Sequence, residues 1–260
     1  MTVLEYRTSE LLTVAAAEYV VACAERSIRE RHRFVIALSG GATPRALYEL
    51  LATDAYVHRI DWRAVHVCFG DERCVPPTDA QSNYKMASDM LLSLVPIASA
   101  NIHRMHGEDV PSKAALAYEV ELRALFATPY GAPTDHAEQR FDLVLLGLGA
   151  DGHTASLFPH GAAVREHTQW VTAEYGASVA MWRLTLSLPV INGARDVVFL
   201  VTGADKASVL QQVLESPVDT NLRPAQGVSP RAGHVTWMVD GAAGSMTTAW
   251  RRSSSTKRML

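Results

Sequence analysis

The feature that most constrains this sequence is a series of short runs that are apolar at nearly every position and alternate with helical segments. The clearest runs are FVIAL (34–38), VHVCF (65–69), FDLVLLGLG (141–149), DVVFLVTG (196–203) and VTWMV (235–239). A strand that is apolar on both faces must be covered on both faces, which is typical of parallel sheets flanked by helices. The alternation therefore predicts an α/β fold built on a parallel sheet.

The segments between these runs read as helices. A long helix is expected over 9–31 with Ser9 as its N-cap, and a second helix begins at Pro44. Further helices are expected over 82–95, 111–126 and 205–215. A short strand is expected over 102–106, and 170–174 and 183–188 alternate like half-buried strands.

No composition shift divides the chain, so one domain over residues 1–250 is expected. The loop 127–140 is expected to be a surface excursion and 251–260 a flexible tail.

Charge and cysteine content narrow the classes of partner. Lys and Arg number 24 against 27 Asp and Glu, a net charge of −3, so no basic excess exists for a nucleic-acid partner. The three cysteines are odd in number and form no CxxC pair, which favours a reducing compartment. The first residues lack the basic segment followed by an apolar core that marks a secretory signal. The most apolar early run carries Glu18, so no membrane partner is expected. We expect a cytoplasmic protein.

Unusual residues follow four of the expected strands. They lie in SGGATP (39–44), GDERCVP (70–76), GLGADGHTASLFP (147–159) and TGADK (202–206). Ligands of open α/β sheets bind beyond the carboxyl ends of strands. These four segments therefore predict one site.

Two of the segments suit an anion. Gly40 and Gly41 permit close backbone approach, and Ser39 and Thr43 add hydroxyl groups before a helix. Lys206 stands at the start of another helix, where only an anionic ligand would make a cation favourable. The alternatives are a plain strand–helix turn with Thr43 as N-cap, and a solvated surface lysine.

The other two segments suit acid–base chemistry. His153 follows a buried strand, with Asp151 two residues away to orient it as a general base. The alternative is a turn histidine. Asp71 and Arg73 should share one face of an extended segment as a carboxylate–guanidinium pair, functional or structural. Cys74 is expected to be inert.

Two further patterns are weak. A GxGxxG pattern is formed by Gly147, Gly149 and Gly152. Asp151, however, would place a negative charge beside the pyrophosphate, and Pro159 ends the next segment too soon for a crossover helix. The histidines form HxxH at 103–106 and recur at 153, 160 and 167, across Pro159. We therefore expect neither a dinucleotide nor a metal.

The chain resembles the 6-phosphogluconolactonase family. The resemblance is carried by SGGATPRALYELL, GDERCVPPTDAQSNY, FDLVLLGLGADGHTASLFPH, RLTLSLPVINGARDVVFLVTGADK and the closing NLRPAQGVSPRAGHVTWMVDGAA. It implies a three-layer α/β/α domain with a mainly parallel, Rossmann-like sheet and no cofactor. It also implies hydrolysis of 6-phospho-D-glucono-1,5-lactone to 6-phospho-D-gluconate in the oxidative pentose phosphate pathway.

The resemblance further assigns site residues. It implies that His153 is the general base and that Asp71 and Arg73 belong to the active-site motif. Residues expected to hold the sugar phosphate are Ser39, Gly40, Gly41, Thr43, Arg183 and Lys206.

Two other functions stay open: a deaminase/isomerase acting on an amino sugar phosphate, and a non-catalytic sugar-phosphate sensor. In the related deaminases a Glu follows five residues after the histidine, where this chain has Phe158, which cannot transfer a proton. The expected partner is a small-molecule sugar-phosphate lactone, and the expected state is a monomer or weak homo-oligomer.

Overall fold

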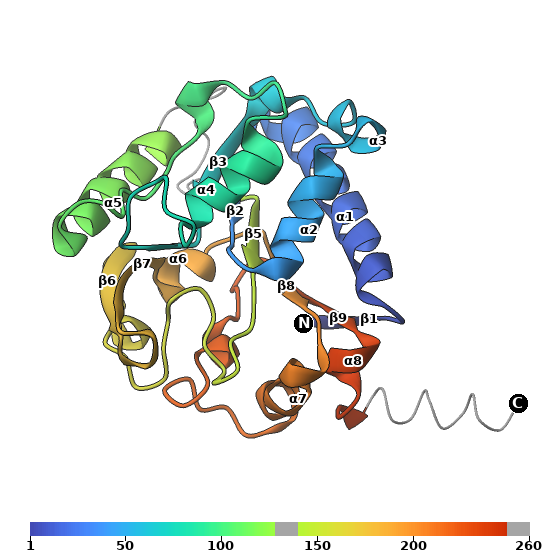
Figure 1. Cartoon of the computed structure of the whole chain (residues 1–260), viewed down its shortest axis with the longest axis vertical. Coiled ribbons are helices and arrows are strands. Elements are labelled where there is room, and N and C mark those ends of the chain that lie inside the picture. Colours follow the sequence, from blue (N-terminus) through green and yellow to red (C-terminus); the bar gives the residue numbers. More distant parts are fainter. Residues whose placement is uncertain (128–139, 249–260) are drawn as a thin grey trace, which may run out of the picture.

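A six-stranded parallel sheet forms the centre of the molecule (Figure 1). A computed structural model describes residues 1–127 and 140–248. Every strand pair in this sheet is parallel, which confirms the α/β prediction. In spatial order the strands are β1 (Thr2–Tyr6), β9 (His234–Asp240), β8 (Asp196–Val201), β5 (Leu143–Leu146), β2 (Phe34–Leu38) and β3 (Val65–Phe69).

Helices cover both faces of the sheet. Figure 1 shows α1 and α2 on one side and α5 on the other. Strands β2, β5 and β8 are buried at every position, which explains why their sequences do not alternate. The helices are α1 (Ser9–Arg31), α2 (Ala42–Leu51), α3 (Asp54–Val57), α4 (Asn83–Ala87), α5 (Pro111–Ala127), α6 (Leu188–Ile191), α7 (Ala207–Glu215) and α8 (Gly241–Gly244).

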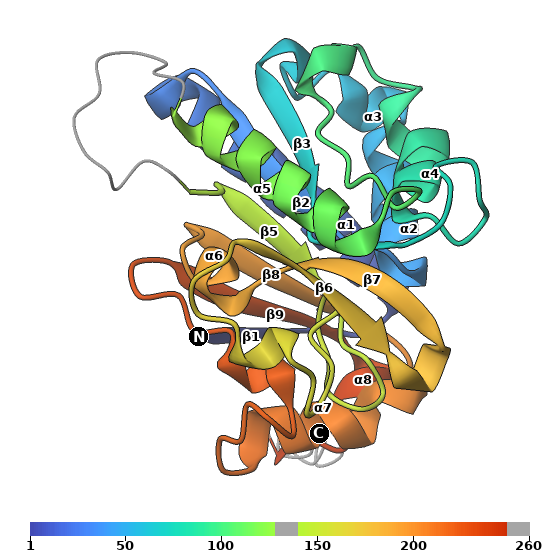
Figure 2. The same ribbon diagram turned by 90° about the vertical axis from the view of Figure 1, so that its left-hand side faces the viewer.

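A second, antiparallel sheet lies on the α5 side of the main sheet (Figure 2). Its order is β4 (Asp71–Arg73), β7 (Met181–Leu186) and β6 (Val171–Gly176). The strand predictions for 170–174 and 183–188 are confirmed. Gly70 joins the two sheets, because β3 ends before it, β4 begins after it, and its carbonyl accepts a hydrogen bond from the Leu186 N–H. The second sheet thus begins at the carboxyl end of the first.

Several local predictions are wrong. Thr8, not Ser9, caps α1, because the Thr8 hydroxyl accepts a hydrogen bond from the Leu11 N–H. Helix α2 begins at Ala42, so Pro44 is its third residue. The expected strand over 102–106 is reduced to one bridge between Val67 and Ile102.

Other predictions hold only in part. The helix expected over 82–95 is α4 followed by a π-helical turn over Ser88–Leu92. Strand β1 was not predicted, because it is a half-exposed edge strand with no clear alternation. The expected flexible tail over 251–260 and nearly all of the expected loop excursion lie outside the described residues.

Candidate active site

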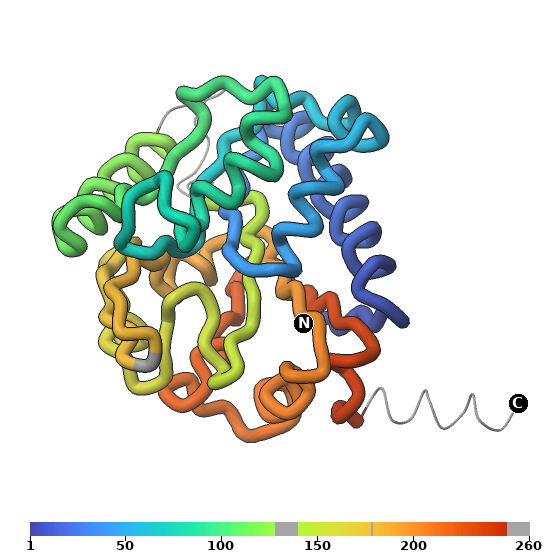
Figure 3. The backbone as a smooth tube through the Cα atoms, viewed as in Figure 1, coloured from blue at the N-terminus to red at the C-terminus, as the bar shows by residue number. Residues whose placement is uncertain are grey.

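The four strand-end segments meet around one cavity of about 340 Å³. The four segments therefore come together at the carboxyl edge of the sheet, as the sequence predicts. Figure 3 shows the chain after β5 running beside the β6–β7 hairpin. That hairpin contributes Val179 and Arg183 to the lining of the cavity. The lining residues are Ser39, Gly40, Gly41, Asp71, Arg73, Asn83, Gly147, Leu148, Gly149, Ala150, His153, Ala155, Ser156, Phe158, Val179, Arg183 and Lys206.

The glycine turn between β2 and α2 forms one wall. Gly41 has φ of 111°, a conformation that favours glycine, and it caps α2 without a side-chain hydrogen bond. The Tyr48 hydroxyl holds the backbone of Ser39 through both its N–H and its carbonyl. The buried Ser39 hydroxyl has no partner among the described residues, so it is available to a ligand.

Thr43 departs from the expected set. Its hydroxyl lies 2.6 Å from the Thr202 hydroxyl, and Thr43 does not line the cavity. The structure therefore uses Thr43 to tie α2 to the segment after β8. It does not act as the N-cap of the helix either, because that position is Gly41.

Arg183 on β7 is the strongest sign of an anion site. Its side chain is only 8% exposed, yet its Nε and Nη1 atoms have no acceptor among the described residues. Burial, and then the charge of Arg73, lower the pKa of Arg183 from its usual value. A buried cation with unused donors is costly, and an anionic ligand would offset that cost.

Lys206 adds a second cation at the start of α7. Its ammonium lies 3.3 Å from the Asp205 carboxylate, which is itself mostly exposed to solvent. That surface pair is worth little, so it leaves Lys206 free to bind a phosphate. The Arg183 and Lys206 side chains thus bring two positive charges to one cavity.

His153 forms another wall of the cavity. The Asp151 carboxylate lies 2.5 Å from His153 Nδ1 and also accepts the His153 N–H. A carboxylate at Nδ1 favours the tautomer in which Nε2 is the basic nitrogen. Burial raises the pKa of Asp151, but its hydrogen bond and charge interaction with His153 outweigh burial and leave that pKa below its usual value. Asp151 therefore orients the imidazole from outside the cavity.

The backbone around His153 is built for this placement. A Cβ on Gly149 would overlap the imidazole, and Gly152 has φ of 86°. Ala155 also has a positive φ, 47°, which costs a non-glycine residue about 1 kcal/mol. The Phe158 ring lies 4.9 Å from the His153 ring, centre to centre. The surrounding structure holds these strained backbone angles, and the Phe158 ring packs against the imidazole.

Asp71 and Arg73 share a face of β4 and line the cavity, as expected, but the expected ion pair between them does not form. The Asp71 carboxylate accepts hydrogen bonds from the Ser156 hydroxyl (2.7 Å) and the Asn83 side-chain amide (3.1 Å). Arg73 instead donates to the Gln81 carbonyl. In register Arg73 faces Arg183, so the like charges share one end of the second sheet.

Asn83 and Ser156 are lining residues that sequence reasoning missed. Both lie within segments that carried the family resemblance, but no local signal sets either side chain apart, so only their contacts with Asp71 reveal them. Cys74 has a pKa raised by burial to about 11, which agrees with the expected inert thiol.

The weak patterns gain no support from the described residues. No helix follows Gly152 before Pro159, so the GxGxxG pattern lacks the helix N-terminus that would hold a pyrophosphate. His103 contacts His66 and Glu121, and the described part of the chain holds no group of three or more possible metal ligands. None of the helices in the described ranges is both long and apolar enough to cross a membrane.

Comparison with known proteins gives a consistent result. Residues 7–237 match the family model described as glucosamine-6-phosphate isomerases/6-phosphogluconolactonase. A protein named 6-phosphogluconolactonase from Synechocystis sp. is 42% identical, covering 84% of this chain and 87% of that protein. One from Haemophilus influenzae is 36% identical, covering 82% and 87%. The solved 6-phosphogluconolactonase from Trypanosoma cruzi has a TM-score of 0.81 at 32% identity, covering 95% of this chain and 97% of that one.

Proposed function

The chain belongs to the glucosamine-6-phosphate isomerase/6-phosphogluconolactonase family, and we propose that it hydrolyses 6-phospho-D-glucono-1,5-lactone to 6-phospho-D-gluconate. It is thus a carboxylic ester hydrolase of the oxidative pentose phosphate pathway. One observation carries the mechanism: a carboxylate-oriented histidine faces the same cavity as a buried arginine whose Nε and Nη1 have no acceptor among the described residues.

Hydrolysis uses His153 as a general base. His153 Nε2 takes a proton from a water molecule, and the water oxygen bonds to C1 of the lactone. The C1 carbonyl becomes an oxyanion, then re-forms as the bond between C1 and the ring oxygen breaks. The imidazolium returns its proton to that ring oxygen, and the new carboxylic acid ionises. Because a δ-lactone is an activated ester, water and one base suffice.

The cationic wall anchors the phosphate. Arg183, Lys206, the Ser39 hydroxyl and the backbone of Gly40 and Gly41 supply donors to it. Holding the phosphate fixes C1 relative to His153, which converts binding energy into correct orientation. Arg73 or backbone N–H groups stabilise the oxyanion. Asp71 lines the same cavity, and its carboxylate is bonded to Ser156 and Asn83.

The wider setting follows from the same proposal. Residues 1–250 form one catalytic domain that needs no cofactor, because the chemistry requires only water and side chains. The protein works in the cytoplasm as a monomer or weak homo-oligomer. The three free cysteines, with no CxxC pair, support a reducing compartment.

The test is a lactonase assay with freshly prepared substrate, corrected for spontaneous hydrolysis. We expect turnover of the lactone and no ammonia from glucosamine 6-phosphate, because Phe158 stands where the deaminases carry a carboxylate. Ammonia release at a rate comparable to that of lactone hydrolysis would favour the deaminase hypothesis. Substrate binding without turnover would instead indicate a sensor.

A further inference from the structure

Glu72 is a buried carboxylate that the mechanism does not use. It lies between Asp71 and Arg73 on β4, is 2% exposed, and points away from the cavity that its two neighbours line. Its oxygens accept hydrogen bonds from four donors. These are the N–H groups of Arg73 (2.7 Å), Asn83 (2.7 Å) and Tyr84 (2.8 Å), and the Ser82 hydroxyl (3.0 Å). Three of the four donors belong to the start of α4.

This contact fixes α4 against β4, and α4 carries Asn83. The Asn83 side-chain amide donates to the carbonyl (2.9 Å) and the carboxylate of Asp71. On its other side the carboxamide fills the space beside Gly40, where any Cβ would overlap it. Asn83 thus spans the distance between the glycine turn and Asp71, two walls of the cavity.

The connection continues to the histidine loop. The Asp71 carboxylate accepts the Ser156 hydroxyl at 2.7 Å, and Ser156 lies three residues after His153. The Ser156 N–H donates to the Thr185 hydroxyl on β7, which holds that loop on the second sheet. A shift of Asn83 would therefore move the glycine turn, which binds the phosphate, relative to His153.

We propose that Glu72 is a positioning residue for the hydrolysis: by holding the first turn of α4 it sets Asn83, and through Asn83 the spacing between the glycine turn and Asp71. The inference rests on the proposed lactonase function. Glu72 touches neither substrate nor reacting atoms, so it acts through geometry alone. The competing interpretation is a buried carboxylate that only stabilises the fold.

The two interpretations differ in Glu72→Gln. The amide keeps the size of the side chain but turns one acceptor into a donor that faces other donors. A displacement of a reacting group by about 1 Å can cost on the order of 100-fold in rate. We expect kcat to fall by roughly 10-fold or more, while KM changes by less than about threefold, because Arg183 and Lys206 still bind the phosphate.

A double-mutant cycle provides the test. E72Q, N83A and the double variant are compared with wild type for kcat and KM, with thermal unfolding measured for each. If Glu72 acts through Asn83, the double variant loses no more kcat than the worse single variant. Losses of kcat that multiply, or an E72Q variant with wild-type kcat, would overturn the proposal.

Asp142→Asn is the matched control. Asp142 is likewise a buried carboxylate that accepts a backbone N–H, from Val35 at 2.8 Å, but it lies at the other end of the sheet. D142N should lower the unfolding temperature and leave kcat within about twofold. A kcat loss in D142N equal to that in E72Q would assign the effect to general destabilisation.

Ser82→Ala keeps the test falsifiable if E72Q does not fold. It removes one of the four donors, so it should lower kcat by a few-fold and add nothing to N83A. Unchanged kcat in S82A, or independent losses, would overturn the proposal. Failure of the proposed function is distinct, because it would appear as absence of lactone turnover in the wild-type protein.

Discussion

The two ends of the parallel sheet differ in whether their buried charged side chains are paired. At the carboxyl end, Arg183 is buried with donors that no described residue accepts, and Ala155 holds a strained backbone angle. At the amino end, the buried carboxylates Asp142 and Asp196 are each bonded to arginine. The contrast indicates where the molecule binds a ligand and where it obtains its stability.

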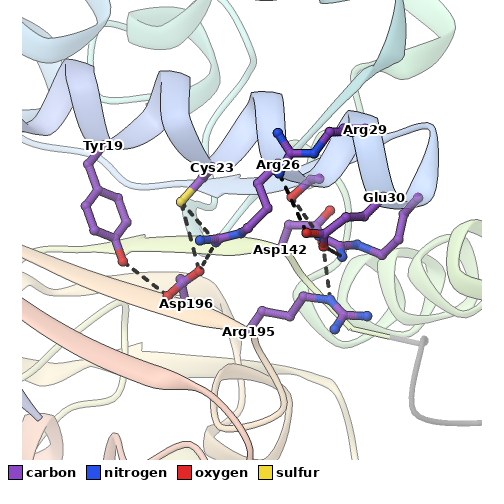
Figure 4. A network of polar contacts seen from close by, with 10 residues as sticks. Tyr19, Cys23, Arg26, Arg29, Glu30, Asp142, Arg195 and Asp196 are labelled. Carbon is purple, nitrogen blue, oxygen red and sulfur yellow. Dashed lines mark hydrogen bonds and ion pairs between the residues drawn. The ribbon is translucent and has the colours of Figure 1, made fainter.

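The amino-end network ties α1 to Asp196, the first residue of β8, and to Asp142, the residue before β5 (Figure 4). Asp196 accepts hydrogen bonds from Arg26 (2.5 Å) and Tyr19 (3.1 Å). Asp142 accepts Arg31 (3.0 Å) and forms an ion pair with Arg195 (3.4 Å). Each buried carboxylate is thus satisfied several times over, as a stable interior requires.

The comparison teaches that one fold separates these two tasks along its strand direction. Unsatisfied cations and strained residues destabilise a fold, and sites that need them depend on stability obtained elsewhere. Changes at the carboxyl end should therefore alter turnover more than stability, and changes at the amino end the reverse.

The largest expected effect is that of His153→Ala. It should lower kcat by about 10²–10⁴-fold, because general-base catalysis is worth that much, with little change in unfolding temperature. Steady-state lactonase kinetics and thermal unfolding measure the two quantities. Retention of more than roughly a tenth of wild-type kcat would show that another group is the base.

Asp196→Asn should show the opposite pattern. Loss of the charge bonded to Arg26 and Tyr19 should lower the free energy of unfolding by about 2–3 kcal/mol, since Arg26 is partly exposed and the pair only partly buried. Denaturant unfolding and kcat are measured on the same preparation. A large loss of kcat in a folded variant would contradict the separation of the two ends.

Lys206→Ala should have a smaller effect, on binding. Loss of one charge-assisted contact to phosphate should raise KM by roughly 10-fold, and kcat should fall only if the phosphate also positions the lactone. Inorganic phosphate should inhibit the wild-type protein competitively and the variant more weakly. If KM, kcat and inhibition all stayed the same, Lys206 would not belong to the site.

The smallest effect concerns the thiols at the two ends. Burial raises the pKa of Cys74, next to the cavity, to about 11, and that of Cys23, in the amino-end network, to about 12. A thiol reacts as its thiolate, so both should resist iodoacetamide at pH 8 and gain reactivity only as the pH approaches those values. Alkylation followed by mass spectrometry measures this, and rapid labelling of Cys74 at pH 8 would contradict its protonated state.

Local sequence signals were sufficient for much of the fold and part of the site. The apolar runs over 34–38 and 196–203 indicated buried parallel strands because no other environment suits a strand that is apolar on both faces. The pairing of Asp151 with His153 was readable because the two residues are two positions apart in one turn. Glycines and polar residues directly after the strands marked the carboxyl edge of the sheet, because this signal too lies within a few neighbouring residues.

The rest depended on contacts between distant segments. The second sheet places Arg73 opposite Arg183, and no pattern in a three-residue strand such as β4 reveals its partner. The Asp71 carboxylate found Ser156, 85 residues away, instead of the neighbouring Arg73. Thr43 was expected to bind the ligand, but its hydroxyl forms a hydrogen bond with that of Thr202, 159 residues away.

By itself, then, the sequence determined which segments are buried, which strand ends line the cavity, and which histidine is oriented by a carboxylate. The tertiary structure alone decided which polar groups are paired and which are left for a ligand. The physical reason is that burial patterns and short-range contacts are written in local spacing. Whether Arg183 or Ser39 finds a partner depends on every segment that the fold brings within hydrogen-bond distance.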